Sequence, residues 1–493
     1  MLQSKSLNVS LLFLVIGIIS FIFADFSITT INPFMELKNF SQAIFQMDIS
    51  QVPKLMPALF TTISIAIVAM LFSAIFGFFL ALIFENFFVR TTLAFTRAIH
   101  ELFWALIFLQ IFGLNTLTAL LAIILPYSAI LAKVYAEILQ EHDTFPQELK
   151  GKSKVSYYLY TKIPNAFPHL KAYTFYRFEC ALRSTAILGF VGITTLGYYL
   201  SSSFMQGYYN EVWLLLILFY IVIATIRWWI NKYTVIPVLI ASFFYLDDFG
   251  SVSFDNFIRF VTSDIVPYPI KMDKPFSEVL AWFEYIFKEE ILIGVFNTIL
   301  LTQISLVLTA VLALITFPLI SKRFTNKFFR GVSHIFLVIL RSTPEYILAY
   351  LFLQIFGPSM LPAALALMLH NGAIIGFLMG QQTDEIDFRL DVTKKKNELY
   401  LYEVLPRIYS QFLAFLFYRW EIIMRESAIL GILGVATLGF FIDSAIADFK
   451  LDKMMLLLFV TAILNILIDL ISKKSRDYLK VEKSITSCGC DLK

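Results

Sequence analysis

The chain has 493 residues, of which 59% are hydrophobic and only 15% are charged, and its formal net charge is +3. Soluble domains usually carry about 25% charged residues and shorter apolar runs. Here apolar runs of about 18 or more residues recur along the whole length, and each is long enough to cross a hydrocarbon core of ~30 Å. The composition predicts an all-α polytopic membrane protein. It excludes an outer-membrane barrel, whose strands would alternate polar and apolar residues over about 10 positions.

These runs predict about twelve transmembrane helices. The first resembles a signal peptide but lacks a small-x-small cleavage site, so we expect a retained span. The seventh, "VIPVLIASFFYL", is the shortest. The twelve segments lie near residues 7–24, 56–84, 95–113, 115–139, 173–200, 211–230, 234–246, 291–319, 331–357, 361–381, 410–440 and 454–472.

The positions of Lys and Arg predict the orientation, because cytoplasmic loops are enriched in both residues. With the N-terminus inside, the inward segments hold 24 of the 39 Lys and Arg residues, and the outward segments hold eight. This bias predicts that both termini, including the basic tail 473–493, are cytoplasmic. The larger outward loop, 247–290, mixes acidic and aromatic residues, and we expect it to form short helices.

The sequence contains an internal repeat. "RAIHELFWALIFLQIFG" (97–113) aligns with "RSTPEYILAYLFLQIFG" (341–357). "YRFECALRSTAILGFVGITTLG" (176–197) aligns with "YRWEIIMRESAILGILGVATLG" (418–439), with twelve identities in 22 positions. Shared hydrophobicity does not explain this match, because Arg and Glu are among the identical residues.

The repeat predicts two parallel six-helix halves, residues 1–232 and 233–493. Because six is an even number, both halves have the same orientation, and a pseudo-two-fold axis along the membrane normal relates them. The loop after the fourth span of each half, 140–172 and 383–409, then faces the cytoplasm.

Charged residues recur inside the predicted spans, where they normally face protein or a water-filled path. One set has Arg and Glu four residues apart on one helix face, for which helix pinning and a pathway role both stay open. A second set forms two trios with an excess arginine, which favours a pathway or gate for an anionic substrate. The first set is Arg97, Glu101, Arg341 and Glu345, and the second is Arg177, Glu179, Arg183, Arg419, Glu421 and Arg425.

Glycines follow each trio at matched positions. Small residues let helices approach closely, and glycines also permit a broken or hinged helix, so tight packing and a gate are both open readings. The six positions are Gly189, Gly192, Gly197, Gly431, Gly434 and Gly439.

His370 and Asn371 lie inside the tenth span, where the first half has Pro126 at the position of the histidine. A hydrogen-bonded structural role and a pathway role are both open for this pair. The difference at this position indicates that the two halves are not functionally identical.

No metal cluster, nucleophile triad or phosphate-binding G-x-x-x-x-G-K-[ST] loop is found in the sequence. We therefore expect no cofactor, no catalytic residue and no nucleic-acid partner, and any ATP hydrolysis must occur on another chain. Cys488 and Cys490 lack nearby His or further Cys, so plain cytosolic thiols are favoured over a metal site.

The repeated "YRFE…LRSTAILGFVG…LG" and "YRWE…MRESAILGILG…LG" segments, with "LRSTPEY…LFLQIFG…LALMLHNGAIIG", resemble the permease subunit of phosphonate-type ABC importers. The resemblance covers residues 56–230 and 291–473 as two tandem copies fused in one chain. It implies a non-enzymatic, inner-membrane permease for phosphonate, phosphate or a related oxyanion. The implied partners are two cytosolic ATP-binding subunits and an extracytoplasmic solute-binding protein.

Permeases of this type carry a cytoplasmic ATPase-coupling loop with the pattern EAA-x3-G-x9-I-x-L-P. Pro164 lies 13 residues after Gly151, which matches the spacing of the pattern, and Pro406 lies 13 residues after Thr393. Neither copy has the EAA sequence, and the second lacks the glycine. The resemblance thus implies a degenerate coupling loop that suits a specialised ATPase.

Three other functions fit parts of the pattern. An ion-gradient-driven secondary transporter also suits twelve spans in two parallel halves, and an ABC permease could carry a different small solute. A membrane scaffold or sensor is the third, although the sequence contains no separate regulatory domain.

Overall fold

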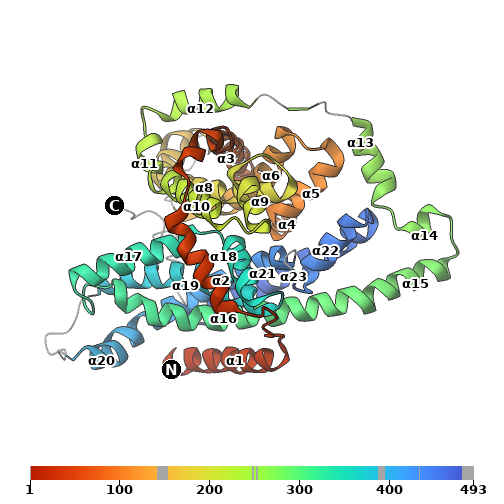
Figure 1. Ribbon diagram of the computed structural model, residues 1–493. Coiled ribbons are helices and arrows are strands. Elements are labelled where there is room, and N and C mark those ends of the chain that lie inside the picture. Colours follow the sequence, from red (N-terminus) through yellow and green to blue (C-terminus); the bar gives the residue numbers. More distant parts are fainter. Residues whose placement is uncertain are drawn as a thin grey trace. The chain divides into compact units, whose positions relative to one another are not determined.

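The computed structural model describes residues 2–141, 154–246, 249–250, 254–386, 395–431 and 434–479 (Figure 1). Within these ranges, the regular secondary structure is entirely helical. The chain divides into two compact units. Unit 1 combines Met1–Ser41 with Val261–Glu482, and unit 2 contains Gln42–Phe260.

Unit 2 contains two short 3₁₀ turns before its first long helix and a π-helical turn, Tyr158–Lys162, before α8. Its helices are α3 (Val52–Leu82), α4 (Phe87–Ala98), α5 (Glu101–Phe112), α6 (Thr116–Glu141), α7 (Lys154–Tyr157), α8 (Ile163–Ile187), α9 (Leu196–Met205), α10 (Tyr209–Ala224), α11 (Ile226–Trp229), α12 (Val235–Tyr245) and α13 (Phe254–Arg259).

Unit 1 has a matching π-helical turn, Leu399–Val404, before α21. Its helices are α1 (Leu2–Phe23), α2 (Pro33–Ala43), α14 (Tyr268–Lys271), α15 (Phe276–Ile286), α16 (Leu292–Ile320), α17 (Lys327–Ser342), α18 (Glu345–Phe356), α19 (Met360–Glu385), α20 (Lys396–Glu398), α21 (Leu405–Leu430), α22 (Leu438–Ala447) and α23 (Leu451–Tyr478).

The expected all-α membrane fold is confirmed. Among the described residues, six helices are long and apolar enough to cross a membrane, and three bent pairs raise the number to nine. The remaining predicted spans correspond to α10, α12, and α21 followed by α22. With 11 residues, α12 is only about 16 Å long, too short to cross the hydrocarbon core as a straight helix.

Sharp bends interrupt the third predicted span and its counterpart. The bend is 94° between α4 and α5 and 93° between α17 and α18. Pro344 explains the second bend, because proline disfavours a helical conformation at the preceding residue. At the first bend, the side chain of His100 caps α5 by accepting a hydrogen bond from the amide of Leu102 at 3.2 Å.

The first helix of each predicted half packs in the unit that contains the other half. The α1 helix packs on α16 and α21, where Phe13 lies edge-on to Phe417 and Trp420. In turn, α12 packs on α3, and the hydroxyl of Tyr245 donates a hydrogen bond to the carbonyl of Pro57 at 3.1 Å. The two units therefore differ from the predicted halves 1–232 and 233–493 by an exchange of their first helices.

Each unit is organised around one extensively packed helix pair, α3 with α6 and α16 with α19. In the second pair, Gly372, Gly376 and Gly380 form a stripe at four-residue spacing that faces Leu312, Thr316 and Ile320 of α16. Because lipid and leucine are similarly apolar, close packing of small residues contributes much of the association of helices in a membrane. The stripe therefore lets the two backbones approach.

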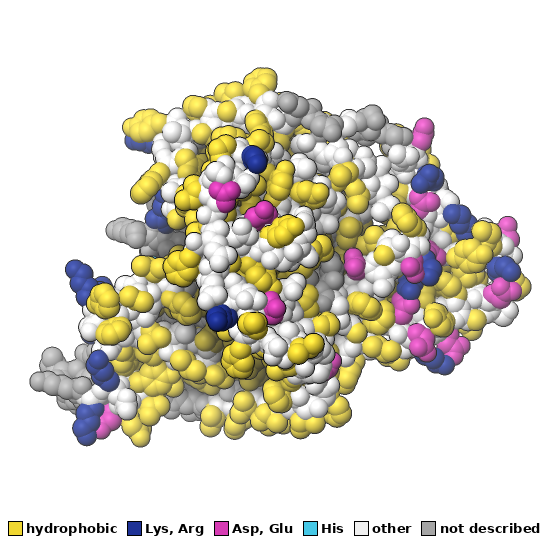
Figure 2. Space-filling model, in the orientation of Figure 1, with side chains coloured by type: hydrophobic (Ala, Val, Ile, Leu, Met, Phe, Trp, Pro, Cys, Tyr) yellow, Lys and Arg dark blue, Asp and Glu magenta, His cyan; other side chains and the backbone are white. Residues whose placement is uncertain are grey.

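The α15 and α16 helices join through a π-helical turn into one 45-residue helix, Phe276–Ile320 (Figure 1). At 1.5 Å per residue it is about 68 Å long, roughly twice the thickness of a hydrocarbon core. Charged side chains gather over α14 and α15, whereas the surface along α1 and α16 is largely hydrophobic (Figure 2). The expected short helices within 247–290 are present among its described residues as α13, α14 and α15.

Candidate functional site

A buried hydrogen-bonded cluster lies at the start of α5 in unit 2. The carboxylate of Glu101 accepts a hydrogen bond from the hydroxyl of Ser184 at 2.6 Å. The Ser184 oxygen lies 2.8 Å from the hydroxyl of Tyr127, which must be the donor because the Ser184 proton is already used. His100 Nε2 lies 3.3 Å from the other carboxylate oxygen of Glu101. Three helices, α5, α6 and α8, thus meet at one carboxylate.

Unit 1 contains a corresponding cluster at the start of α18. Glu345 is buried there, with its Oε2 atom 4.0 Å from Nε2 of His370. Asn371 donates a hydrogen bond to Oε2 of Glu426 at 3.0 Å, and Arg419 Nη1 lies 3.4 Å from the side-chain oxygen of Asn371. This cluster joins α18, α19 and α21.

The repeat alignment makes the two clusters equivalent. Glu101 corresponds to Glu345, and Ser184 corresponds to Glu426. Tyr127 corresponds to Asn371, and both donate to the residue on the charged helix. Sequence reasoning singled out the two glutamates at the bends, His370 and Asn371. It missed His100, Tyr127, Ser184 and Glu426 as site residues, although the aligned "RST" and "RES" triplets mark two of them.

The arginines of the first trio make local contacts along α8. Arg177 Nε donates to the hydroxyl of Tyr173 at 2.8 Å, and its guanidinium lies over the rings of Tyr173 and Tyr176. Arg183 Nη2 lies 3.1 Å from Sγ of Cys180. Within the described residues, Glu179 makes no ion pair with Arg183, although their spacing allows one.

The arginine that precedes each bend ends its helix. Arg97 lies in the last turn of α4 and Arg341 in the last turn of α17, where the helix dipole favours a cation. The guanidinium of Arg341 also lies 4.2 Å from the ring centre of Phe377. In the second trio, Arg419, Glu421 and Arg425 are all partly buried on α21.

Four of the six glycines that follow the trios lie in close contact with backbone atoms. A Cβ atom added to Gly197 or Gly439 would lie 1.9 or 1.7 Å from the carbonyl oxygen of Ala186 or Ala428. A Cβ atom on Gly189 or Gly431 would lie 2.1 or 2.3 Å from the backbone nitrogen of Tyr198 or Phe440. Gly192 and Gly434 have positive φ angles of 96° and 89°, which favour glycine. The chain can thus turn back closely after α8 and α21.

The coupling-loop residues Gly151 and Thr393 lie outside the described residues. Pro164 and Pro406 are exposed in the first turn of α8 and α21, each directly after a π-helical turn.

An exposed Leu-Tyr pair precedes each of these prolines. Leu159 and Tyr160 are 56% and 80% exposed, and the equivalent Leu401 and Tyr402 are 53% and 78% exposed. Sequence reasoning missed these residues, although "YLYTKIP" and "YLYEVLP" align without a gap. Two large side chains are therefore presented at the same place in both halves.

Tyr400 anchors the second pair to the long helix. Its ring stacks on Phe317 with 5.3 Å between ring centres, and its hydroxyl donates to the carbonyl of Leu314 at 3.1 Å. Partial burial raises the pKa of Tyr400 above its ordinary value, so the hydroxyl stays protonated as a donor at neutral pH. Tyr400 therefore packs this short segment against α16.

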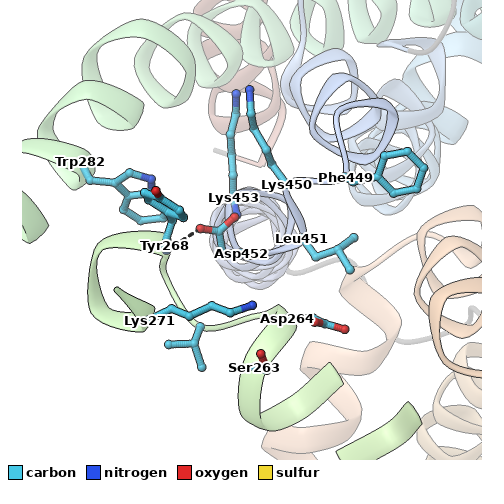
Figure 3. Close-up of a pocket in the computed structure, with 11 residues that line it drawn as sticks. Ser263, Asp264, Tyr268, Lys271, Trp282, Phe449, Lys450, Leu451, Asp452 and Lys453 are labelled. Carbon is cyan, nitrogen blue, oxygen red and sulfur yellow. Dashed lines mark hydrogen bonds between the residues drawn. The ribbon is translucent and has the colours of Figure 1, made fainter. Parts of the chain in front are cut away.

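A cavity of about 450 Å³ lies in unit 1 between the segment from Ser263 to Trp282 and the turn from α22 to α23 (Figure 3). The amide of Tyr268 donates to Oδ2 of Asp452 at 2.8 Å and closes one side. Lys271 and Lys450 also line it. The lining combines charged side chains with apolar ones, and it shares no residue with the buried clusters.

The fold defines a helical membrane protein, and the aligned segments place an equivalent cluster in each unit. Residues 311–477 match the family described as the inner membrane component of binding-protein-dependent transport systems. The resemblance to phosphonate-type ABC permeases, expected from the repeated motifs, is thereby confirmed.

Two curated relatives extend this similarity. The phosphate-import permease protein PhnE of Mycolicibacterium smegmatis is 22% identical over 398 residues, which cover 74% of this chain and 72% of the relative. The phosphite transport system permease protein PtxC of Stutzerimonas stutzeri is 28% identical over 155 residues, 30% of this chain and 56% of the relative. The first alignment is longer than either predicted half, so it extends across both. No solved structure matches the chain.

The glycine geometry predicts the effect of added methyl groups. Gly197→Ala and Gly439→Ala should each destabilise the protein by about 1–3 kcal/mol, because the new Cβ atom meets a backbone carbonyl that cannot rotate away. Gly331→Ala is the control, since a Cβ atom there has no neighbour within 4 Å. Thermal unfolding of the purified variants measures the effect, and equal melting temperatures for all three would contradict the packing role.

Proposed function

We propose that the chain is the membrane permease of an ABC importer for phosphonate, phosphate or a related oxyanion, and that separate subunits hydrolyse ATP. The observation that carries this proposal is the similarity to a phosphate permease and a phosphite permease, one of which aligns across both halves. The match of residues 311–477 to the transport family supports the same class. The two membrane subunits that form such a permease from separate chains would then be fused in one polypeptide.

Two cytosolic ATP-binding subunits dock, in this proposal, on the loops 140–172 and 383–409. The exposed Leu-Tyr pairs support this placement, since aromatic side chains dominate binding energy at protein interfaces. Their equivalent positions suit two identical partners. An extracytoplasmic solute-binding protein delivers the anion on the opposite side of the cytoplasmic membrane, and both chain termini lie in the cytoplasm.

The arginines of the trios attract the oxyanion along its path. Guanidinium groups bind phosphate-like oxygens through parallel hydrogen bonds, and a partly apolar setting strengthens each interaction. The glutamates at the bends line the path in both halves. His370 and Asn371 line it in the second half. The glycines after α8 and α21 permit the close backbone turns next to it, where a gate would act.

A secondary transporter driven by an ion gradient is the alternative. The buried glutamates favour it, because intramembrane carboxyl groups form proton relays in such transporters. The matched cytoplasmic Leu-Tyr pairs favour the ABC permease instead.

Reconstituted uptake tests the function. Proteoliposomes that hold the chain with its ATPase and solute-binding protein should accumulate labelled phosphate, methylphosphonate or phosphite only when ATP is supplied on the ATPase side. Vesicles without the ATPase or without the binding protein are the controls. Uptake by the purified chain alone under a proton or sodium gradient would instead establish the alternative.

Arg183→Ala and Arg425→Ala should each reduce the uptake rate by roughly 10–100-fold, the loss expected for one charge-assisted hydrogen bond of about 1.5–3 kcal/mol. The amount of folded protein in the membrane should stay constant. Arg90→Ala, at an exposed position of α4, is the control. A parallel loss of uptake and of folded protein would assign these arginines to helix pinning.

Tyr160→Ala and Tyr402→Ala should each weaken binding of one ATPase subunit, and the double variant should lose both. Truncation of an interface hot spot costs about 2 kcal/mol or more, a roughly 30-fold loss of affinity. Tyr233→Ala is the matched control, because Tyr233 is 75% exposed on the same predicted side of the membrane. Co-purification measures bound ATPase, and full retention in the double variant would exclude this docking surface.

A further inference from the structure

We propose that Glu345, His370 and Glu426 form a binding site for one divalent transition-metal cation in the second half of the chain. The proposal does not depend on what the protein transports. It concerns three buried side chains that come from three different helices, α18, α19 and α21. Each of these helices packs against the other two.

The geometry places three ligand atoms around a common point. One donor atom from each residue lies within 4.8 Å of the other two. Two ligands of one zinc ion, each at about 2.0–2.2 Å, are separated by roughly 3.5 Å in tetrahedral geometry. Small side-chain rotations would therefore bring the three donors into coordination distance.

The histidine is held in the tautomer that a metal requires. His370 Nδ1 lies 2.8 Å from the carbonyl oxygen of Thr343. A carbonyl can only accept, so Nδ1 carries the proton and Nε2 of the neutral ring carries the lone pair. A backbone carbonyl in this role is the usual orienting partner of a metal-binding histidine. Nε2 is also the atom nearest Glu345, at a distance of 4.0 Å that exceeds a hydrogen bond.

The second carboxylate is oriented in a similar way. The side-chain amide of Asn371 donates to Oε2 of Glu426 at 3.0 Å, which fixes the plane of this carboxylate. Hydrogen bonds of this kind to a ligand carboxylate are a regular part of metal sites. Two of the three ligands therefore already have a partner that sets their direction.

Charge and burial favour a divalent ion. The exposed fractions of Glu345, His370 and Glu426 are 7%, 3% and 8%. An ionised carboxylate only accepts, so two of them beside one imidazole form a donor set that suits a divalent cation. One imidazole with two carboxylates suits zinc or manganese, whereas calcium and magnesium prefer oxygen ligands alone.

The first half of the same chain provides an internal comparison. Glu101 is equivalent to Glu345, but Pro126 and Ser184 occupy the positions of His370 and Glu426. Ser184 instead donates a hydrogen bond to Glu101, so the first half has one carboxylate at the place where the second half has two. Among the described residues, only the second half brings His and two Glu together in this way. We therefore expect one metal ion per chain.

Zinc binding to the purified full-length chain tests the proposal. The chain carries Cys488→Ser and Cys490→Ser, so that the tail thiols cannot contribute. After chelator treatment, addition of zinc and gel filtration, elemental analysis should find about one zinc per chain. Glu426→Ser and His370→Ala should each weaken zinc affinity at least about 100-fold, because loss of an orienting partner alone costs about 10–100-fold.

The controls separate this site from other binding. His334→Ala removes an exposed histidine from α17 of the same half and should retain one zinc. Glu426→Ser introduces the residue found at the matched position of the first half, so it gives a second test if His370→Ala fails to fold. Absence of stoichiometric zinc from the unsubstituted protein would overturn the proposal, and so would equal zinc binding by the folded ligand variants. Uptake of the anion is not a readout, so failure here leaves the transport function standing.

Discussion

Burial of a carboxylate at a break in a membrane helix is the constraint on which the arrangement of each half depends. Glu101 and Glu345 begin α5 and α18 directly after bends of 94° and 93°. An ionised side chain at the centre of a membrane costs at least ~2.5–3.5 kcal/mol on insertion scales, so a carboxylate inside a span normally has partners on neighbouring helices. The helix start provides unpaired backbone N–H groups and a favourable dipole. The side chains from α6 and α8, or from α19 and α21, then converge on the carboxylate.

The two halves satisfy this constraint with different residues. The first uses a neutral chain from Tyr127 through Ser184 to Glu101. In the second, Asn371 and Glu426 replace the tyrosine and the serine, and the nearby histidine comes from α19 rather than from the bend. A serine cannot hold a negative charge, whereas a glutamate can. The repeat therefore preserves the positions of the polar groups but changes the charge that they hold.

Much of the fold could be predicted from the sequence, because long apolar runs and a repeat that includes charged residues are strong signals. Pro344 is a cause of the second bend that can be seen in the sequence. The equivalent bend at His100 has no such signal, because a histidine that caps a helix is not marked by any sequence spacing. The role of Ser184 could not be seen from either half alone. A serine in an apolar helix commonly bonds to its own backbone, and only the convergence of α5, α6 and α8 gives it another partner.

The assignment of helices to units was beyond the reach of sequence patterns for a different reason. Hydropathy shows that α1 and α12 are apolar, but a uniformly apolar helix has no preferred face that identifies its neighbour. Its partner depends on shape. In α1, Gly17 lies against Val307, and Ser10 accepts a hydrogen bond from Tyr409 at 2.7 Å. Neither contact has a local signature, and each joins residues almost 300 or 400 positions apart.

The exchange of first helices has a consequence for biosynthesis. About 270 residues separate the end of α1 from the start of α16, on which it packs. At about 5–20 residues per second, the ribosome needs roughly 15–50 s to synthesise that stretch. During this delay α1 lacks the helix on which it packs, and a segment without charged residues from Leu7 to Phe23 can remain in lipid. Because both helices belong to one chain, α16 stays tethered to α1, whereas helices on two separate polypeptides would have to meet by diffusion in the bilayer.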